Sequence, residues 1–313
     1  MKQALALLKQ QLQQQVIGQE NVVEGLLIAL VANGHVLLEG LPGTAKTRTV
    51  KALAAAMTVD MGRIQFTPDL MPADVVGYEV AQAENALAMT FVPGPVFNNI
   101  LLADEINRAP PKVQSALLEA MEERQVTVGG KTHPMPELFL VLATENPIEQ
   151  EGTYPLPEAQ LDRFLMKINV GYLDKASELL MLRLVKSEEM AIPPVQTIDP
   201  QVILDARKAI SEVYCSENIE QYIVDLVVAT RHPTGKLKEW IAVGGSPRAT
   251  IAIEKCARAH AWLENKEFVD PDDVRAVLLP TLGHRLVLSF QASAQKIDAQ
   301  VVIAQLLQQV PVQ

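Results

Sequence analysis

The stretch Gly40-Leu41-Pro42-Gly43-Thr44-Ala45-Lys46-Thr47 decides the fold of this chain. An apolar run at 36–38 precedes it and predicts a buried strand, and the run at 49–57 is typical of a helix. A glycine-containing loop between a strand and a helix holds phosphate oxygens on backbone N–H groups at the helix N-terminus. The stretch therefore predicts a nucleotide-phosphate site, in which Lys46 reaches the β- and γ-phosphates and the Thr47 hydroxyl binds Mg²⁺.

Ala45 departs from the usual G-x-x-x-x-G-K-[ST] pattern, because it stands where the last glycine is expected. This position opens the first turn of a helix, where φ is negative, so alanine costs little there. Arg48, which follows the loop, is also expected to contact the nucleotide. A loop that lacks this glycine can match the pattern by chance. Other stretches of the chain must therefore show whether it is a phosphate-binding loop.

A second stretch, Ile100-Leu101-Leu102-Ala103-Asp104-Glu105, is typical of a buried strand that ends in two carboxylates. Open α/β sheets bind their ligands at the carboxyl edge of the strands. We expect Asp104 to orient Mg²⁺ through its waters, and Glu105 to polarise the water that attacks the γ-phosphate. The alternative is a solvated Asp-Glu pair at the end of an ordinary strand. Its position after a phosphate loop argues against that alternative.

A third apolar run at 138–143 ends in Thr144-Glu145-Asn146-Pro147. The Asn146 amide is expected to lie between the strands that carry Lys46 and Glu105, where it would hold the attacking water by hydrogen bonds. An Asn-Pro turn that merely closes the strand is the alternative, and the dipeptide alone does not decide between the two.

In this order the three stretches resemble an AAA+ ATPase and, more narrowly, the MoxR family. The similarity extends through two longer stretches, Asp104-Glu105-Ile106-Asn107-Arg108-Ala109-Pro110-Pro111 and Glu158-Ala159-Gln160-Leu161-Asp162-Arg163-Phe164. Ala45 is common in this family, so the departure from the general pattern supports the narrower assignment. The resemblance covers nearly the whole chain and implies ATP and Mg²⁺ as ligands.

The resemblance assigns further roles by position. Val16 and Ile17 match the N-terminal box that lies against adenine, a role compatible with plain core packing. Arg163 matches the arginine finger, which stabilises transition-state charge on a neighbouring subunit's nucleotide. Its alternative is a surface ion pair with Asp162 or Glu158.

Arg248 follows Ser246-Pro247, a helix N-cap and a proline at the first helical position. It matches the sensor-2 arginine, which contacts the γ-phosphate in AAA+ proteins. The sequence leaves open whether Arg108 and Arg124 point at a subunit interface or into solvent.

The fold class expected is α/β: an AAA+ P-loop core with a five-stranded parallel sheet, followed by a smaller all-helical lid domain. The core spans 1–173 and carries two hairpin inserts, at about 77–92 and 125–134. A helix and a linker occupy 174–198, and the lid occupies 199–313. Three helix starts of the cap-then-proline type are expected in the lid, at Asp199-Pro200, Ser246-Pro247 and Asp270-Pro271.

The charge balance bears on the kind of substrate. Asp and Glu outnumber Lys and Arg by 37 to 27, the net charge is −10 and aromatic residues make up 4%. Translocation along nucleic acid needs cations and usually stacking aromatics, so we expect protein partners and no nucleic acid. No apolar run approaches a membrane span, and Cys215 and Cys256 are expected to be reduced, buried thiols of a cytoplasmic protein.

The resemblance implies an ATP-hydrolysing, chaperone-like machine that works as a ring, a hexamer, with a von Willebrand A domain partner in metal or cofactor insertion. A magnesium-chelatase-like ATPase subunit is one alternative. A nucleotide-dependent scaffold with little turnover is another, and intact Lys46, Asp104, Glu105, Asn146, Arg163 and Arg248 argue against it.

Overall fold

A computed structural model describes residues 1–40, 46–81, 89–147, 152–190 and 196–312. Residues 41–45 of the predicted phosphate loop, the turn of the first hairpin and the linker expected near 191–194 lie outside the described residues.

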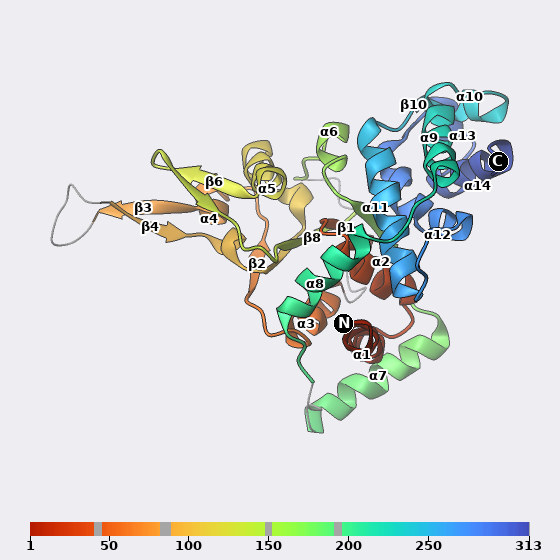
Figure 1. The fold of residues 1–313 in the computed structure, drawn as a ribbon. Helices are drawn as coiled ribbons and strands as arrows, with labels where there is room; N and C mark the ends of the chain where they lie inside the picture. The colour runs from red at the N-terminus through yellow and green to blue at the C-terminus, as the bar shows by residue number, and fades with distance from the viewer. Residues whose placement is uncertain (41–45, 82–88, 148–151, 191–195, 313) are drawn as a thin grey trace.

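A five-stranded parallel sheet forms the centre of the molecule, as the sequence predicts (Figure 1). Its strand order is β2-β5-β8-β1-β9. The strands are β1 (Val36–Gly40), β2 (Met61–Gln65), β5 (Ile100–Asp104), β8 (Leu140–Glu145) and β9 (Met166–Val170). Because β5, β8 and β1 lie inside the sheet and are covered on both faces, their apolar runs are nearly continuous.

Alternate residues of these strands enter two different hydrophobic clusters. Ile100 and Leu102 pack on one face, and Leu101 and Ala103 pack on the other. This is the two-residue period of a strand expressed in a doubly covered sheet. The helices of the core are α1 (Lys2–Gln15), α2 (Glu20–Val31), α3 (Lys46–Ala55), α4 (Pro72–Val76), α5 (Pro111–Glu123) and α6 (Glu158–Leu161).

Two antiparallel hairpins form where the sequence predicts them and project away from the rest of the chain (Figure 1). The first pairs β3 (Gly77–Ala81) with β4 (Met89–Pro93), and the second pairs β6 (Gln125–Val128) with β7 (Lys131–Pro134). Gly129 and Gly130 both have positive φ, at 58° and 77°, as a two-residue hairpin turn requires. The Phe91 ring of the first hairpin stacks on the His133 ring of the second, with centroids 4.0 Å apart, so the two hairpins are packed together.

Helices dominate the C-terminal region. They are α7 (Lys175–Met190), α8 (Pro200–Ser211), α9 (Glu217–Arg231), α10 (Lys236–Trp240), α11 (Pro247–Leu263), α12 (Pro271–Leu282), α13 (Phe290–Ala294) and α14 (Ala299–Gln309). The three predicted cap-then-proline starts are confirmed, because the side chains of Asp199, Ser246 and Asp270 each accept a hydrogen bond from a backbone N–H of the first turn.

The prediction of a purely helical lid is wrong in one detail. Two short strands, β10 (Ile241–Val243) and β11 (Val287–Leu288), form an antiparallel pair among the lid helices. Strands of two and three residues are too short to show a two-residue period, so the sequence pattern did not reveal them. The lid helices share one continuous hydrophobic cluster with α1, α2 and α3, which fixes the lid on the core.

Candidate functional site

Lys46 lies at the carboxyl edge of the sheet, as predicted. Its ammonium donates to the carbonyl oxygen of Gly40, at 2.6 Å, and to that of Glu145, at 3.2 Å. Those two carbonyls end β1 and β8, so the lysine bridges the ends of adjacent strands. Burial lowers the pKa of Lys46, and the nearby carboxylates of Asp104 and Glu105 act in the opposite direction. Such a half-buried cation is well placed for a phosphate group.

Asp104 is buried, with 8% of its surface exposed, and each of its carboxylate oxygens has a partner. Arg63 on β2 donates to Oδ2 at 2.8 Å, and the Thr144 hydroxyl on β8 donates to Oδ1 at 2.7 Å. The Thr144 hydroxyl in turn accepts from the backbone N–H of Glu105 at 2.8 Å. One threonine therefore fixes both acidic positions from the neighbouring strand.

Glu105, which directly follows β5, has a left-handed backbone with φ at 58°. Its carboxylate accepts from the Gln65 amide at 2.8 Å and forms an ion pair with Arg108 at 3.2 Å. A non-glycine residue in this conformation is uncommon and costs of order 1 kcal/mol. Arg108 thus pairs with Glu105 within this chain, and whether it also points at a subunit interface stays a prediction.

Asn146 follows β8, which is hydrogen-bonded to both β5 and β1. The predicted place between the strands of Glu105 and Lys46 is thus confirmed. Asn146 is buried, with 3% exposed, and its backbone oxygen accepts from the Asn107 amide at 3.3 Å. Whether the Asn146 side chain holds a water stays a prediction.

The start of α3 is tied to the predicted adenine box. Arg48 donates from Nε to the backbone oxygen of Gln15 at 2.9 Å and from Nη2 to its side-chain oxygen at 3.1 Å. Gln15 ends α1 and directly precedes Val16, which is buried, and Ile17, which is half-buried. The contact brings the box to the first turn of the phosphate-side helix.

The donor set at this edge fits a magnesium ion. Thr47, half-buried in the first turn of α3, offers a hydroxyl, and Asp104 offers a carboxylate. Mg²⁺ prefers such hard oxygen ligands and is usually held by one or two protein groups together with phosphates and waters. Among the described residues, no group of three or more His, Cys, Asp or Glu side chains could hold a metal without such help.

Arg163 and Arg248 lie elsewhere. Arg163 precedes β9 and Arg248 lies in the first turn of α11, and both pair with the same carboxylate, Glu122 in the last turn of α5. Arg163 Nε lies 3.1 Å from Glu122, and its Nη1 donates to the Leu118 oxygen at 3.0 Å. The alternative prediction was a surface ion pair of Arg163 with Asp162 or Glu158. The structure pairs Arg163 with Glu122 instead.

These two arginines lie at the amino edge of the sheet. The residue before Glu122, Met121, accepts from the ring of His35, which directly precedes β1. Leu165, which directly precedes β9, donates to the His35 backbone oxygen at 2.9 Å. Since a strand advances ~3.3 Å per residue, the five residues of β1 put roughly 13 Å or more between this edge and Gly40.

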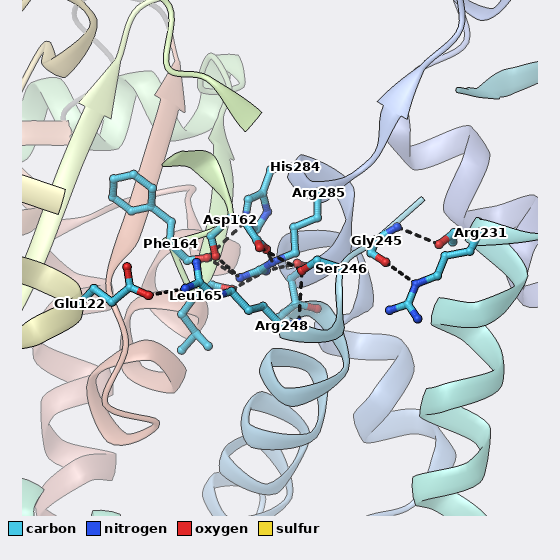
Figure 2. Close-up of polar contacts among 12 residues, drawn as sticks. Glu122, Asp162, Phe164, Leu165, Arg231, Gly245, Ser246, Arg248, His284 and Arg285 are labelled. Atoms are coloured by element: carbon cyan, nitrogen blue, oxygen red, sulfur yellow. Dashed lines mark hydrogen bonds and ion pairs between the residues drawn. The ribbon is translucent and has the colours of Figure 1, made fainter. Parts of the chain in front are cut away.

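Polar contacts among Asp162, Ser246 and Arg285, which we call the latch, join the lid to the core near Arg248 (Figure 2). Asp162 accepts from Arg285 Nε at 2.7 Å and from the Ser246 hydroxyl at 2.9 Å. Arg285 is almost fully buried and also donates to the backbone oxygens of Asp162, Phe164, Leu165 and Thr281. Burial lowers the pKa of Arg285, and Asp162 opposes that shift. Asp162 is the residue next to Arg163, so the contacts of Asp162 with the lid also hold the backbone beside Arg163.

A groove of about 360 Å³ opens between core and lid at this edge. Its lining contains five cationic side chains and two acidic ones, which leaves a net charge of +3 (five minus two). The cations are Arg124, Arg163, Arg248, Lys255 and Arg285, and the acids are Glu122 and Asp162. Arg124 donates within its own chain, to the Asn33 side chain at 2.6 Å and to the Phe139 oxygen at 3.2 Å, and a role at a subunit interface stays a prediction.

Several residues of both edges escaped the sequence reasoning. Arg63, Gln65, Thr144 and Glu122 all act on residues far away in the chain. The sequence could have indicated Arg63 and Gln65. They are alternate residues at the end of β2, so they share one face of a strand that ends beside Asp104 at the ligand-binding edge.

The family comparisons agree with this geometry. The profile of the ATPase family associated with various cellular activities (AAA) matches residues 35–166, and the AAA lid domain profile matches residues 237–306. Among the described residues, no helix is long and apolar enough to cross a membrane.

Named relatives cover nearly the whole chain. It is 45% identical to chaperone MoxR1 of Mycobacterium tuberculosis over 94% of this chain and 78% of that protein. It is 36% identical to protein MoxR of Paracoccus denitrificans over 88% of this chain and 86% of that protein. A crystal structure of a candidate ATPase from Cytophaga hutchinsonii superimposes with a TM-score of 0.92 at 43% identity, covering 100% of this chain and 96% of that one.

Proposed function

Because the chain belongs to the MoxR family of AAA ATPases, we propose that it hydrolyses ATP at sites shared between neighbouring subunits of a ring. The observation that carries the proposal is the separation of the two groups of site residues. Lys46, Asp104 and Glu105 lie at the carboxyl edge of the sheet, and Arg163 and Arg248 lie at the amino edge.

At the carboxyl edge, the chain's own residues bind the nucleotide and prepare the attack. Lys46 exchanges its two carbonyl partners for phosphate oxygens, and Thr47 and Asp104 would hold Mg²⁺, which neutralises phosphate charge when bound. Glu105 accepts the proton of the attacking water, once it has left Gln65 and Arg108, and Asn146 orients that water.

At the amino edge, Arg163 and Arg248 act on the nucleotide of the adjacent subunit. The groove around them has a net lining charge of +3, which is complementary to a bound nucleotide with its phosphates. An arginine supplied across an interface can be worth ~10³-fold or more in rate. A site that needs both edges explains why assembly into a ring, for which we propose six subunits, would control turnover.

The two packed hairpins are the proposed contact with a protein partner. The first exposes Tyr78, Val80 and Met89, with 51%, 44% and 46% of their surfaces accessible. Apolar side chains on a projecting hairpin suit a polypeptide better than a phosphate backbone, which agrees with the net charge of −10. We propose protein remodelling of the chaperone type, with a von Willebrand A domain protein as partner in metal or cofactor insertion.

A second candidate function is a nucleotide-dependent scaffold. The contacts that favour it are those of Gln65 and Arg108, because they occupy the Glu105 carboxylate that would have to activate the water. A magnesium-chelatase-like subunit would share the same site and differ only in its partner. Steady-state ATP turnover of the assembled protein separates the scaffold from the ATPase.

Mixing two inactive variants tests the shared site. Arg163→Ala and Glu105→Gln should each bind ATP and hydrolyse it poorly. In mixed rings some interfaces pair an intact Glu105 with an intact Arg163, so turnover should recover in part. Lack of recovery in rings that contain both variants, shown by differential tagging and pull-down, would rule out the shared site.

A further inference from the structure

One carboxylate, Glu122, holds both arginines of the amino edge. Its Oε2 lies 3.1 Å from Nε of Arg163, and its Oε1 accepts from Nη2 of Arg248. Arg163 belongs to the core and Arg248 to the lid, so this carboxylate joins the two parts of the chain at the groove. No motif of the sequence points to Glu122.

The arrangement answers an electrostatic difficulty. Two guanidinium groups that must converge on one phosphate repel each other, by about 4 kcal/mol for unit charges 4 Å apart near a protein surface. A carboxylate between them replaces that repulsion by two attractive contacts. The cluster of Glu122, Arg163 and Arg248 keeps a net charge of +1 (two minus one), so it remains suited to an anion.

Glu122 also leaves donors of both arginines available. Arg163 uses Nε for Glu122 and Nη1 for the Leu118 oxygen, and Nη2 has no partner among the described residues. Arg248 uses Nη2 for Glu122, and its Nε and Nη1 have no partner within the described parts of the chain. The side chains of Arg163 and Arg248 remain 32% and 47% exposed, which allows a group from outside to reach them.

The position of Glu122 is itself fixed. It lies in the last turn of α5, which Arg124 ends in a left-handed conformation with its N–H on the Ala120 oxygen. The adjacent Met121 is buried and its backbone oxygen is bound by His35. A separate contact, between Asp162 and Arg285, already fastens the lid at this place. Glu122 is therefore not needed as a fastener, and its effect falls on the two arginines.

We propose that Glu122 is a positioning residue that sets Arg163 and Arg248 as one unit for the nucleotide of the adjacent subunit. The inference rests on the proposed shared site. Glu122 touches no reacting atom. It fixes the direction in which both guanidinium groups leave their own subunit, and a misdirected group loses much of its effect on the rate.

The test compares Glu122→Gln with the matched control Glu123→Gln, which removes the same charge from an exposed neighbour. Glu122→Gln should lower kcat by about tenfold or more and leave KM for ATP and ring assembly near the wild-type values, because the nucleotide is bound by the other edge. Glu122→Asp, which keeps the charge, should recover part of the loss. A wild-type kcat for Glu122→Gln would overturn the proposal.

Mixing experiments assign Glu122 to one side of the interface. Glu122→Gln mixed with Glu105→Gln should regain activity, because one variant supplies an intact Glu105 and the other an intact arginine pair. Glu122→Gln mixed with Arg163→Ala should regain none, since both variants damage the same side. If these two complement each other, Glu122 serves its own subunit's site and the proposal fails.

The mixture of Arg163→Ala with Glu105→Gln serves as the benchmark pair. Its outcome separates a failure of the Glu122 proposal from a failure of the shared site. If Arg163→Ala and Glu105→Gln complement each other while Glu122 falls in the wrong group, only the role of Glu122 is lost. If the benchmark pair fails to complement in mixed rings, the shared site itself is wrong. If circular dichroism shows that Glu122→Gln is misfolded, Glu122→Ala, which also removes the charge, takes its place in all mixtures.

Discussion

The two edges of the sheet use the same kinds of side chain in opposite ways. At the carboxyl edge, Arg63 and Thr144 bind a buried acid, Asp104, of which 8% is exposed. At the amino edge, an acid, Glu122, binds two arginines that are partly exposed. The first edge is organised around acids that face a ligand bound by this chain. The second is organised around cations, which outnumber the acids by five to two among the described residues that line the groove.

Under the proposed shared site, this difference means that neither edge is complete by itself. A catalytic base and a phosphate-binding lysine without an arginine leave transition-state charge uncompensated, and arginines without a nucleotide have no substrate. A strand length separates the two sets within one chain, so under the proposal a second copy would unite them. Damage to one edge should therefore leave the function of the other edge unaffected.

The largest stability effect is expected at the amino edge. Asp162→Ala leaves Arg285, with 3% of its side chain exposed, without its carboxylate. Removal of one partner of a buried ion pair costs about 3–5 kcal/mol of unfolding free energy. Chemical denaturation measures this loss of unfolding free energy. The ATP affinity of the folded protein should not change, because we propose that the nucleotide is bound at the other edge.

The control is Asp272→Ala, which removes the acid of an exposed pair with Arg275. An exposed pair contributes about 0–1 kcal/mol. Equal losses for the two variants would show that the latch of Asp162 and Arg285 does not fasten the lid.

At the carboxyl edge we expect the opposite pattern, a loss of ATP affinity with little loss of stability. Lys46→Ala removes the counter-charge of the phosphates and should weaken ATP binding by about 10–100-fold, which corresponds to ~1.4–2.8 kcal/mol. Stability of the nucleotide-free protein should hardly fall, because burial already disfavours the charged form of Lys46, as its lowered pKa indicates. Isothermal titration with ATP and a denaturation curve measure the two quantities.

Lys51→Ala, an exposed change on the same helix, is the control. If Lys46→Ala destabilised the free protein as much as Asp162→Ala does, the assignment of ligand binding to one edge and lid attachment to the other would be wrong.

The sequence predicted where the local residues of the carboxyl edge lie. Lys46 and Thr47 follow from a loop pattern, and Asp104, Glu105 and Asn146 follow from polar residues at the ends of apolar runs. Parallel strands bring such ends together, so the carboxyl edge could be placed without coordinates.

The sequence could not predict the contacts that cross the fold. Thr144 and Arg63 act on Asp104 from neighbouring strands, and the register that aligns them is set by the whole sheet. Arg248 and Glu122 lie 126 residues apart in the chain. Their meeting depends on how the lid packs on the core, and no spacing rule covers it.

The smallest effect concerns a core–lid contact away from both edges. His260 on α11 lies between Glu24 of α2, at 3.5 Å, and the buried Asp273 of α12, at 2.7 Å. Its pKa is raised, first by the hydrogen bond to Glu24 and then by Asp273, against the opposing effect of burial. A raised folded-state pKa stabilises the fold fully below the ordinary value of 6.5, and the stabilisation is lost as pH rises through the folded-state pKa.

Unfolding free energy of the wild type should therefore fall as the pH rises above the ordinary histidine pKa of 6.5 and through the raised pKa of His260. His260→Gln should flatten that part of the profile, and His232→Gln, at an exposed position, should leave it as it is. A profile unchanged by His260→Gln would show that the Glu24–His260–Asp273 contact does not stabilise the lid.

The shared site is tested most directly by specific ATPase activity measured over a range of protein concentrations, with the assembly state determined by mass photometry at each point. Turnover per chain should rise in proportion to the fraction of chains in rings and approach zero in the monomer, while the monomer still binds ATP through Lys46. Full turnover by a dilute monomer would contradict the account, because it would mean that one chain completes its own site.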